Sequence, residues 1–240
     1  IDIMLAIDVS TSMLAEDLKP NRLEAAKDVA AEFINGRPND NIGITLFAGE
    51  TFTQCPLTVD HAVLLDMIHN IKCGLIEDGT AVGMGVANAV TRLKDSKAKS
   101  KVVILLTDGT NNKGDISPLT AAEIAKSFGI RVYTIGVGTN GMAPYPYPVG
   151  NTVQYINMPV EIDEKTLTQI AGTTDGNYFR ATSNSKLKEV YEEIDKLEKT
   201  KLNVKEYSKR EEDYRWFALA AFLCVLLEVL LRNSILKKIP

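Results

Sequence analysis

The chain has 240 residues, of which 45% are hydrophobic and 24% charged, and its formal net charge is −4. A chain of this size and composition can bury a substantial core, so we predict one globular domain followed by a tail. The negative charge offers no broad attraction to a phosphate backbone, which excludes non-specific nucleic-acid binding. The cysteines Cys55, Cys73 and Cys224 form no C-x-x-C pair. Cys55 and Cys73 could form a disulfide, but we favour two buried free thiols.

The sequence begins inside a strand pattern, because residues 1–7 form an apolar run. Since no initiator methionine or signal-like segment precedes this run, we expect a fragment with further sequence upstream. Such short apolar runs are typical of parallel strands that are buried on both faces. They recur at residues 42–47, 102–106 and 132–137, and a further short strand is expected at residues 50–53.

Segments with helical periodicity alternate with these strands. They lie at residues 23–34, 61–71, 81–93, 119–128, 164–171 and 187–197. In the last of them, five apolar residues should pack against the sheet, namely Leu187, Val190, Tyr191, Ile194 and Leu197. The alternation predicts an α/β fold with a doubly wound, mostly parallel sheet and one short antiparallel edge strand.

Polar side chains follow two of the predicted strands. Asp8, Ser10 and Ser12 come directly after residues 1–7, and Asp108 follows residues 102–106. Ligands of such sheets bind beyond the carboxyl ends of the strands, where Thr80 opens a neighbouring helix. Taken singly, these residues are common helix caps and turn formers. Together, two carboxylates and three hydroxyls predict a site for Mg²⁺, with Mn²⁺ or Ca²⁺ as alternatives, and an acidic group of a partner could fill an open position.

Three motifs resemble a von Willebrand factor A domain with its metal-ion-dependent adhesion site (MIDAS). They are Asp8-Val9-Ser10-Thr11-Ser12, Asp78-Gly79-Thr80 and Leu106-Thr107-Asp108-Gly109. The resemblance covers about residues 1–197 and implies a Rossmann-like fold. It also implies that Asp8, Ser10, Ser12, Thr80 and Asp108 are the five metal-site positions. Beside them, we interpret Asp78 as a cap of the next helix, while Glu77 could support the ligands from behind. We interpret Asn111 and Asn112 as turn residues, and the alternative is that they support the ligands.

Further motifs are similar to the bacterial aerotolerance (Bat) membrane proteins. They are residues 76–81, the run Thr107-Asp108-Gly109 followed by Asn111-Asn112, and residues 155–163. This resemblance implies transmembrane helices upstream and at the C-terminus, in the bacterial inner membrane. It also implies that the partners are other Bat proteins and a MoxR-type AAA+ ATPase in stress or oxygen tolerance.

The end of the chain has a different composition, since residues 216–231 are apolar apart from Glu228. About 16 helical residues span roughly 24 Å, which snorkelling arginines and Trp216 can extend towards the ~30 Å hydrocarbon core. We interpret the run as a transmembrane helix; the alternative is a packing helix, because Glu228 is costly in lipid.

This interpretation divides the chain into a domain, a charged linker and a transmembrane helix with a basic tail, at residues 1–199, 200–215 and 216–236. Within the linker, residues 201–207 look more extended than helical. Basic residues on both sides of the apolar run leave the membrane side open, and the Bat resemblance favours the periplasm.

The function that we predict is a membrane-anchored, divalent-cation-dependent protein interaction module without catalytic activity. The alternatives are a metal-dependent phosphatase or hydrolase and a scaffold with an empty site. A dehalogenase-type phosphatase needs an acid two residues after its nucleophilic aspartate, where Ser10 stands and cannot transfer the proton. The glycines in Gly83-Met84-Gly85 lack the third glycine of a phosphate loop, so they indicate close helix packing.

Residues 139–159 combine glycines and prolines with Tyr145, Tyr147 and Tyr155. The segment is too long for an ordinary connection and should emerge near the metal-bearing edge. We predict that it is part of a partner-docking surface; the alternative is a surface hairpin with no role in binding.

Overall fold

The structure is a computed structural model that describes residues 1–150, 152–208, 218–219, 221–222, 225 and 228–229. The chain divides into two units, Ile1–Glu198 and Lys199–Pro240. Most of the apolar run at residues 216–231, and Cys224 within it, lies outside the described residues. None of the helices in the described part is long and apolar enough to cross a membrane.

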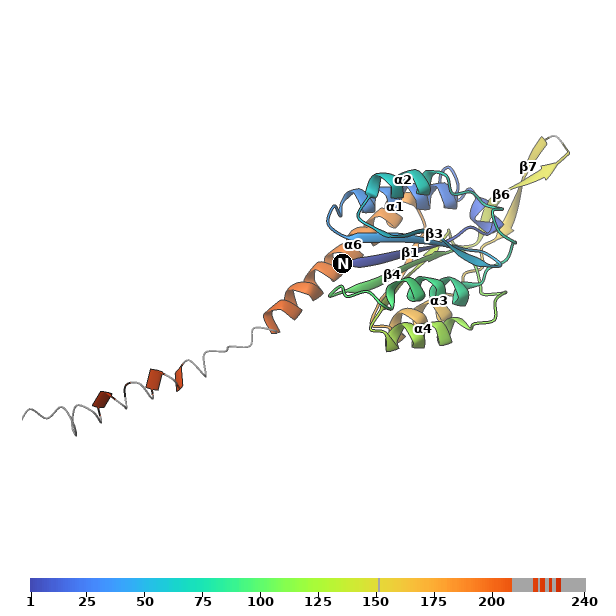
Figure 1. The fold of residues 1–240 in the computed structure, drawn as a ribbon. Helices are drawn as coiled ribbons and strands as arrows, with labels where there is room; N and C mark the ends of the chain where they lie inside the picture. Colours follow the sequence, from blue (N-terminus) through green and yellow to red (C-terminus); the bar gives the residue numbers. More distant parts are fainter. Residues whose placement is uncertain (151, 209–217, 220, 223–224, 226–227, 230–240) are drawn as a thin grey trace, which may run out of the picture. The chain divides into compact units, whose positions relative to one another are not determined.

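A six-stranded sheet with the order β3-β2-β1-β4-β5-β8 forms the centre of the first unit (Figure 1). Neighbouring strands are parallel except for β3, which runs antiparallel to β2 at one edge. The strands are β1 (Asp2–Asp8), β2 (Asn41–Phe47), β3 (Thr51–Thr58), β4 (Lys101–Thr107), β5 (Arg131–Val137) and β8 (Tyr178–Ala181). The predicted α/β fold with a mostly parallel sheet is confirmed.

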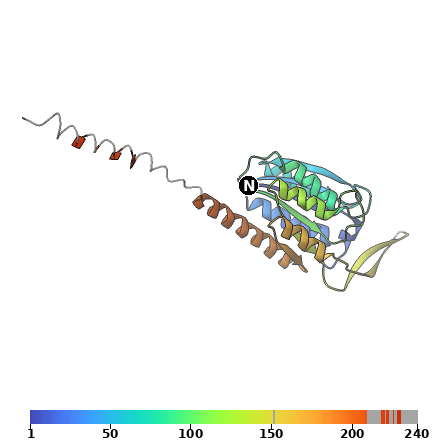
Figure 2. The ribbon, with the colours of Figure 1, turned by 90° about the horizontal axis from the view of Figure 1, so that it is seen from below.

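Helices cover both faces of this sheet (Figures 1 and 2). One face carries α1 (Arg22–Asn35), α2 (His61–His69) and α6 (Asn184–Ser208), and the other carries α3 (Val82–Leu93), α4 (Pro118–Ser127) and α5 (Glu164–Thr173). Side chains alternate along each strand, so Ile3 and Leu5 of β1 pack on the first face while Met4 and Ala6 pack on the second. Burial on both faces is the reason that the strands appear in the sequence as unbroken apolar runs.

Two edge features differ from the prediction. Strand β3 runs for eight residues, Thr51–Thr58, rather than four, and it includes Pro56. An edge strand tolerates proline because one side of its backbone has no neighbour to bond. Strand β8 was not predicted, since its four residues are too few to show an alternating pattern.

Helix α6 packs against the sheet through the residues that the periodicity predicted. Leu187, Val190, Tyr191 and Ile194 are buried, and Leu197 is partly buried against the same core. The prediction of an extended segment at residues 201–207 was wrong, since α6 continues to Ser208. This stretch contains no glycine or proline, and four of its seven residues are Lys, Leu or Glu, which favour helix. Extending an existing helix by such residues costs far less than starting a new one.

The glycines of α3 allow close packing, as predicted. A Cβ atom at Gly83 would lie 2.0 Å from the carbonyl oxygen of Ile116, and one at Gly85 would lie 2.7 Å from the ring of Phe47. By contrast, a Cβ atom at Gly172 in α5 would have nothing within 4 Å. Gly83 and Gly172 therefore form a matched pair of helical glycines with opposite surroundings.

We expect Gly83→Ala to lower the free energy of unfolding by about 1–3 kcal/mol, because a backbone carbonyl must move to admit the methyl group. Gly172→Ala should raise it by up to about 1 kcal/mol, since alanine is the better helix former. Urea unfolding of both variants measures the difference. Changes of the same sign would contradict the packing role of Gly83.

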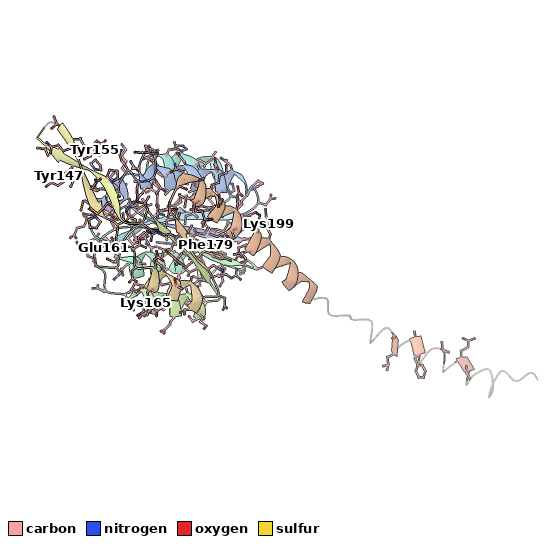
Figure 3. The ribbon with its side chains drawn as sticks, turned by 180° about the vertical axis from the view of Figure 1, so that it is seen from behind. Tyr147, Tyr155, Glu161, Lys165, Phe179 and Lys199 are labelled. Carbon is pink, nitrogen blue, oxygen red and sulfur yellow. The ribbon has the colours of Figure 1, made fainter. Side chains whose placement is uncertain are left out.

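Strands β6 (Met142–Val149) and β7 (Thr152–Pro159) form a separate two-stranded antiparallel sheet. Figure 3 shows this hairpin standing out from the rest of the first unit, with Tyr147 and Tyr155 on it. A surface hairpin was one of the two alternatives for this segment, but the sequence pattern predicted no strand bounds, because three prolines interrupt β6 at every second position. Proline is compatible with a strand where its missing N–H faces away from the neighbouring strand.

Candidate metal centre

The carboxyl ends of β1 and β4 lie side by side, because these strands are parallel neighbours. Asp8 is the last residue of β1, and Asp108 directly follows β4. Both are almost fully buried, at 0% and 3% exposed. The loop before α3 supplies Thr80, which is 4% exposed.

A row of hydrogen bonds joins four of the five predicted residues. The backbone N–H of Ser10 donates to Asp8 Oδ1 at 2.9 Å. The hydroxyl oxygens of Ser10 and Ser12 lie 2.9 Å apart, and Ser12 Oγ donates to Asp108 Oδ1 at 2.7 Å. A short 3₁₀ turn, η1 (Thr11–Leu14), follows Ser10 and carries Ser12. Tertiary structure therefore gathers these side chains at one sheet edge.

Thr80, the fifth predicted residue, lies against the loop that carries Asp108. A Cβ atom at Gly109 would lie only 3.3 Å from Thr80 Oγ1. Asn112 holds the Thr80 backbone on both sides, since Thr80 N donates to Asn112 Oδ1 at 2.9 Å and Asn112 N donates to Thr80 O at 3.0 Å. Asn112 is thus more than a turn residue, because it positions Thr80.

Asp78 does not cap the next helix, which corrects our prediction. Ala81 is the N-cap of α3, and it makes no side-chain cap hydrogen bond. Instead, the carboxylate of Asp78 accepts hydrogen bonds from Thr11 N at 3.0 Å and Thr11 Oγ1 at 2.7 Å. The helix starts too late for Asp78 to reach its free N–H groups, and the side chain joins two loops of the site.

Burial and mutual repulsion raise the energy of the two ionised aspartates in the absence of a cation. Burial and the nearby charge of Asp108 raise the pKa of Asp8, and burial raises the pKa of Asp108. Thr107 Oγ1 donates to Asp8 Oδ2 at 2.6 Å and offsets part of this penalty. A divalent cation between the carboxylates would stabilise both ionised forms.

Arg22 is a member of the site that the sequence analysis missed. Its Nη1 donates to Asp108 Oδ2 at 2.7 Å, and its Nε and Nη2 form a bidentate pair with Asp17, also at 2.7 Å. The residue is 3% exposed. One signal could have revealed it, since Arg22 lies in the first turn of α1, where a cation opposes the helix dipole and so needs another partner.

Asp17 joins this network to the segment that leads into the hairpin, because it accepts a hydrogen bond from Thr139 N at 2.8 Å. Burial alone would raise the pKa of Asp17, but the hydrogen bonds from Arg22 and Thr139 lower it from 3.8 to about 2. At pH values above the ordinary pKa of an aspartate, ionised Asp17 therefore stabilises the fold. This contribution is lost as the pH falls through the pKa that Asp17 has in the folded protein.

We expect this contribution to be about 2 kcal/mol at neutral pH and to vanish between about pH 4 and pH 2. At pH 7 the Asp17→Asn variant should therefore have a lower free energy of unfolding than the wild-type chain. The difference between the two free energies should shrink as the pH falls. Urea unfolding as a function of pH measures both curves. A gap that stayed constant down to pH 2 would show that the charge of Asp17 does not stabilise the fold.

The donor set of the candidate site consists of oxygen atoms alone. In the part of the chain that the structure describes, no three His, Cys, Asp or Glu side chains gather as a metal-binding group. A cation here would depend on the hydroxyls of Ser10, Ser12 and Thr80 and on water as well as on two carboxylates. That chemistry fits a hard divalent cation such as Mg²⁺. Cys55 and nearby Cys73 are both free thiols, as predicted, but only Cys55 is buried, and Cys73 is half-buried.

The family model for von Willebrand factor type A (VWA) domains matches residues 2–193. The chain belongs to the VWA family. It is 33% identical to BatB from Bacteroides thetaiotaomicron, with a TM-score of 0.72 over 83% of this chain and 99% of that chain. An aerotolerance-related membrane protein from Bacteroides fragilis is also 33% identical, with a TM-score of 0.70 over 82% and 99% of the two chains. The predicted resemblance of this VWA domain to Bat proteins is confirmed.

A more distant VWA neighbour has a metal in the corresponding type of motif. Proximal thread matrix protein 1 of the mussel byssus, whose MIDAS motif is occupied by zinc, is 26% identical, with a TM-score of 0.63 over 82% of this chain and 45% of that chain. Among relatives by sequence, a UPF0353 protein of Mycolicibacterium paratuberculosis is 30% identical over 203 residues. The chain spans 58% of the length of that relative.

Proposed function

We propose that this VWA domain is a protein interaction module whose binding depends on a divalent cation held by Asp8, Ser10, Ser12, Thr80 and Asp108. The observation that carries the proposal is the hydrogen-bonded row from Ser10 through Ser12 to Asp108, which places hard oxygen donors at one edge of the sheet. Membership of the VWA family and the zinc-occupied MIDAS of the mussel protein support it.

The charges around the site favour an acidic ligand from a partner protein. Asp108 shares its negative charge with Arg22, at 2.7 Å, and so neutralises a bound cation only in part. A partner carboxylate would complete both the coordination and the charge balance. This group comes from outside the chain, so cation binding and partner binding should strengthen each other.

A pocket of about 260 Å³ adjoins the site and gives the partner a place to dock. Thr11 and Ser12 line one side of it, while Tyr145, Tyr147 and Met158 of the hairpin contribute the other. The hairpin is tied to the loop after η1, because Glu16 N donates to Pro144 O at 2.8 Å. We propose that apolar neighbours of the partner's acidic residue pack against these rings.

The Bat relatives suggest the setting of this module. We propose that it binds other Bat-family proteins and a MoxR-type AAA+ ATPase, with Mg²⁺ as the cation and Mn²⁺ or Ca²⁺ as alternatives. Residues 216–236 would anchor it in the bacterial inner membrane through the linker at 200–215, with the domain in the periplasm. The B. fragilis relative is itself a membrane protein. We propose no catalytic activity, because Ser10 occupies the place of a catalytic acid.

The test combines cation titration, partner capture and turnover. The full chain and its Asp8→Asn variant are titrated with Mg²⁺ and Mn²⁺, then used to capture Bat proteins and the MoxR-type ATPase of the same genome, with Mg²⁺ or with EDTA. Hydrolysis of p-nitrophenyl phosphate is followed in parallel. We expect capture that needs both Mg²⁺ and Asp8, and no turnover. Turnover that Asp8→Asn abolishes would establish the hydrolase instead, and capture unaffected by EDTA would establish a cation-independent scaffold.

The contribution of the hairpin is tested separately. Replacing residues 142–159 by a short Gly-Ser linker should weaken capture while circular dichroism and Mg²⁺ binding stay unchanged. Capture at wild-type strength by this folded variant would exclude the hairpin from the docking surface.

A further inference from the structure

The two outer edges of the β6–β7 hairpin differ in their chemistry. Successive residues of a strand direct their N–H and C=O groups to opposite edges. Pro144, Pro146 and Pro148 have no N–H, so the residues between them donate to β7 and the prolines face the outer edge of β6. The hydrogen bond from Glu16 N to Pro144 O agrees with this orientation. From Pro144 to Pro148, the outer edge of β6 therefore presents acceptors without donors.

The outer edge of β7 presents both donors and acceptors. In the hairpin register, Tyr145 pairs with Ile156 and Tyr147 with Gln154. The alternate residues of β7 consequently direct their N–H and C=O groups outwards, and these are Val153, Tyr155 and Asn157. Every residue of β7 is exposed, and no described strand other than β6 pairs with it. Such an edge is a template for one more strand.

Strand β7 itself also lacks the charges that normally protect an exposed strand, although Glu16 of the loop after η1 accepts a hydrogen bond from the Tyr155 hydroxyl. Residues 138–160 contain no Asp, Glu, Lys or Arg, although 24% of the whole chain is charged. Val153, Tyr155, Ile156 and Met158 are between 44% and 60% exposed. Exposed edges usually carry lysine or other charges, and a two-stranded hairpin is only marginally stable by itself. Both facts favour an edge that another strand covers.

We propose that the outer edge of β7 pairs antiparallel with the same edge of a second copy of this chain, so that two hairpins form one four-stranded sheet. Two identical edges meet around a two-fold axis. A charged residue at or near this axis would lie opposite the same residue of the second copy and be repelled by its like charge. An uncharged edge meets that requirement, which a foreign strand would not impose. Centred on Tyr155, the pairing sets Val153 opposite Asn157 of the second copy.

This self-pairing is independent of the proposed cation-dependent docking. The pocket beside the metal site is lined by Tyr145, Tyr147 and Met158, whose side chains share one face of the hairpin. The pairing edge instead uses backbone groups of Val153, Tyr155 and Asn157. A dimer would therefore carry two accessible metal sites with their docking pockets, and loss of the cation should leave the dimer intact.

Sedimentation velocity of the full chain in mild detergent, over a wide concentration range, tests the proposal. Tyr155→Pro removes both hydrogen bonds at the two-fold axis and should weaken the dimer roughly tenfold or more. Tyr155→Val keeps the N–H and a good strand former, so its dimer should stay within a few-fold of wild type. Asp8→Asn should form dimers as the wild-type chain does, which separates this test from that of the metal site.

Amide hydrogen exchange of the wild-type chain gives a second readout that needs no variant. Protection of the Val153, Tyr155 and Asn157 amides should rise with protein concentration, while protection of β1 amides should not change. A chain that stays monomeric throughout, or dimers that Tyr155→Pro does not weaken, would overturn the proposal. So would edge amides whose exchange is independent of concentration.

Discussion

The Asp8→Asn variant is expected to lose Mg²⁺ binding while folding into a protein at least as stable as the cation-free wild-type chain. Asparagine retains the shape of the side chain and an oxygen that can accept from Ser10 N. It removes one of two buried carboxylates that repel each other. The variant therefore avoids the energetic cost of this repulsion, but it also loses a negative charge that a bound cation needs.

Thermal unfolding with and without Mg²⁺ measures this effect. A cation at one hundred times its dissociation constant should stabilise the wild-type fold by about 2.7 kcal/mol, and Asp8→Asn by almost nothing. Asp60→Asn is the matched control, because Asp60 caps α2 from an exposed position and asparagine caps equally well. This control should respond to Mg²⁺ like the wild-type chain. An Asp8→Asn variant that responds as strongly would remove Asp8 from the metal site.

The second large effect is expected at Arg22. Arg22→Met leaves Asp17 and Asp108 buried without their cationic partner, and breaking such a buried pair costs about 3–5 kcal/mol of unfolding free energy. Arg92→Met is the control, since Arg92 is exposed on α3 and donates only to Thr53 Oγ1 among the described contacts. It should cost less than about 1 kcal/mol.

A double variant separates the charge of Arg22 from its packing. Adding Asp17→Asn to Arg22→Met removes one of the two carboxylates that lack a cationic partner. The double variant should therefore lose less unfolding free energy than the sum of the losses of the two single variants. Arg22→Met should also bind Mg²⁺ more tightly, because Asp108 no longer shares its charge with a guanidinium group. Urea unfolding and Mg²⁺ titration measure these effects. Strict additivity, or a cost below 1 kcal/mol for Arg22→Met, would contradict a structural role for the ion pairs.

The five candidate ligands could be predicted because each belongs to a short motif beside an element with a clear pattern. Asp8 and Asp108 end apolar runs, and parallel strands bring such ends to one edge of the sheet. The residues that position these candidate ligands could not be predicted in the same way. Arg22 reaches Asp108 across 86 positions, and Asn112 reaches Thr80 across 32. A local pattern can show that Arg22 needs a partner, but it cannot identify a partner so far away in the chain.

The errors in secondary structure have similar physical causes. Prolines interrupted the alternation of β6, which is a strand because its N–H groups are needed on one side only. Residues 201–207 look irregular by hydrophobic pattern, yet they continue α6 because the helix was already started. In both places the neighbouring segment decided the conformation, and the local composition alone did not.

The sequence by itself determined the strand and helix alternation, the site-bearing sheet edge and the chemistry of the donor oxygens, because these depend on residue type and short spacing. Only the tertiary structure decided that Arg22 forms an ion pair with Asp108, that Asp78 joins two loops of the site, and that one edge of β7 has no neighbouring strand among the described residues. Those features arise from contacts between distant segments, whose geometry is set by packing on both faces of the sheet.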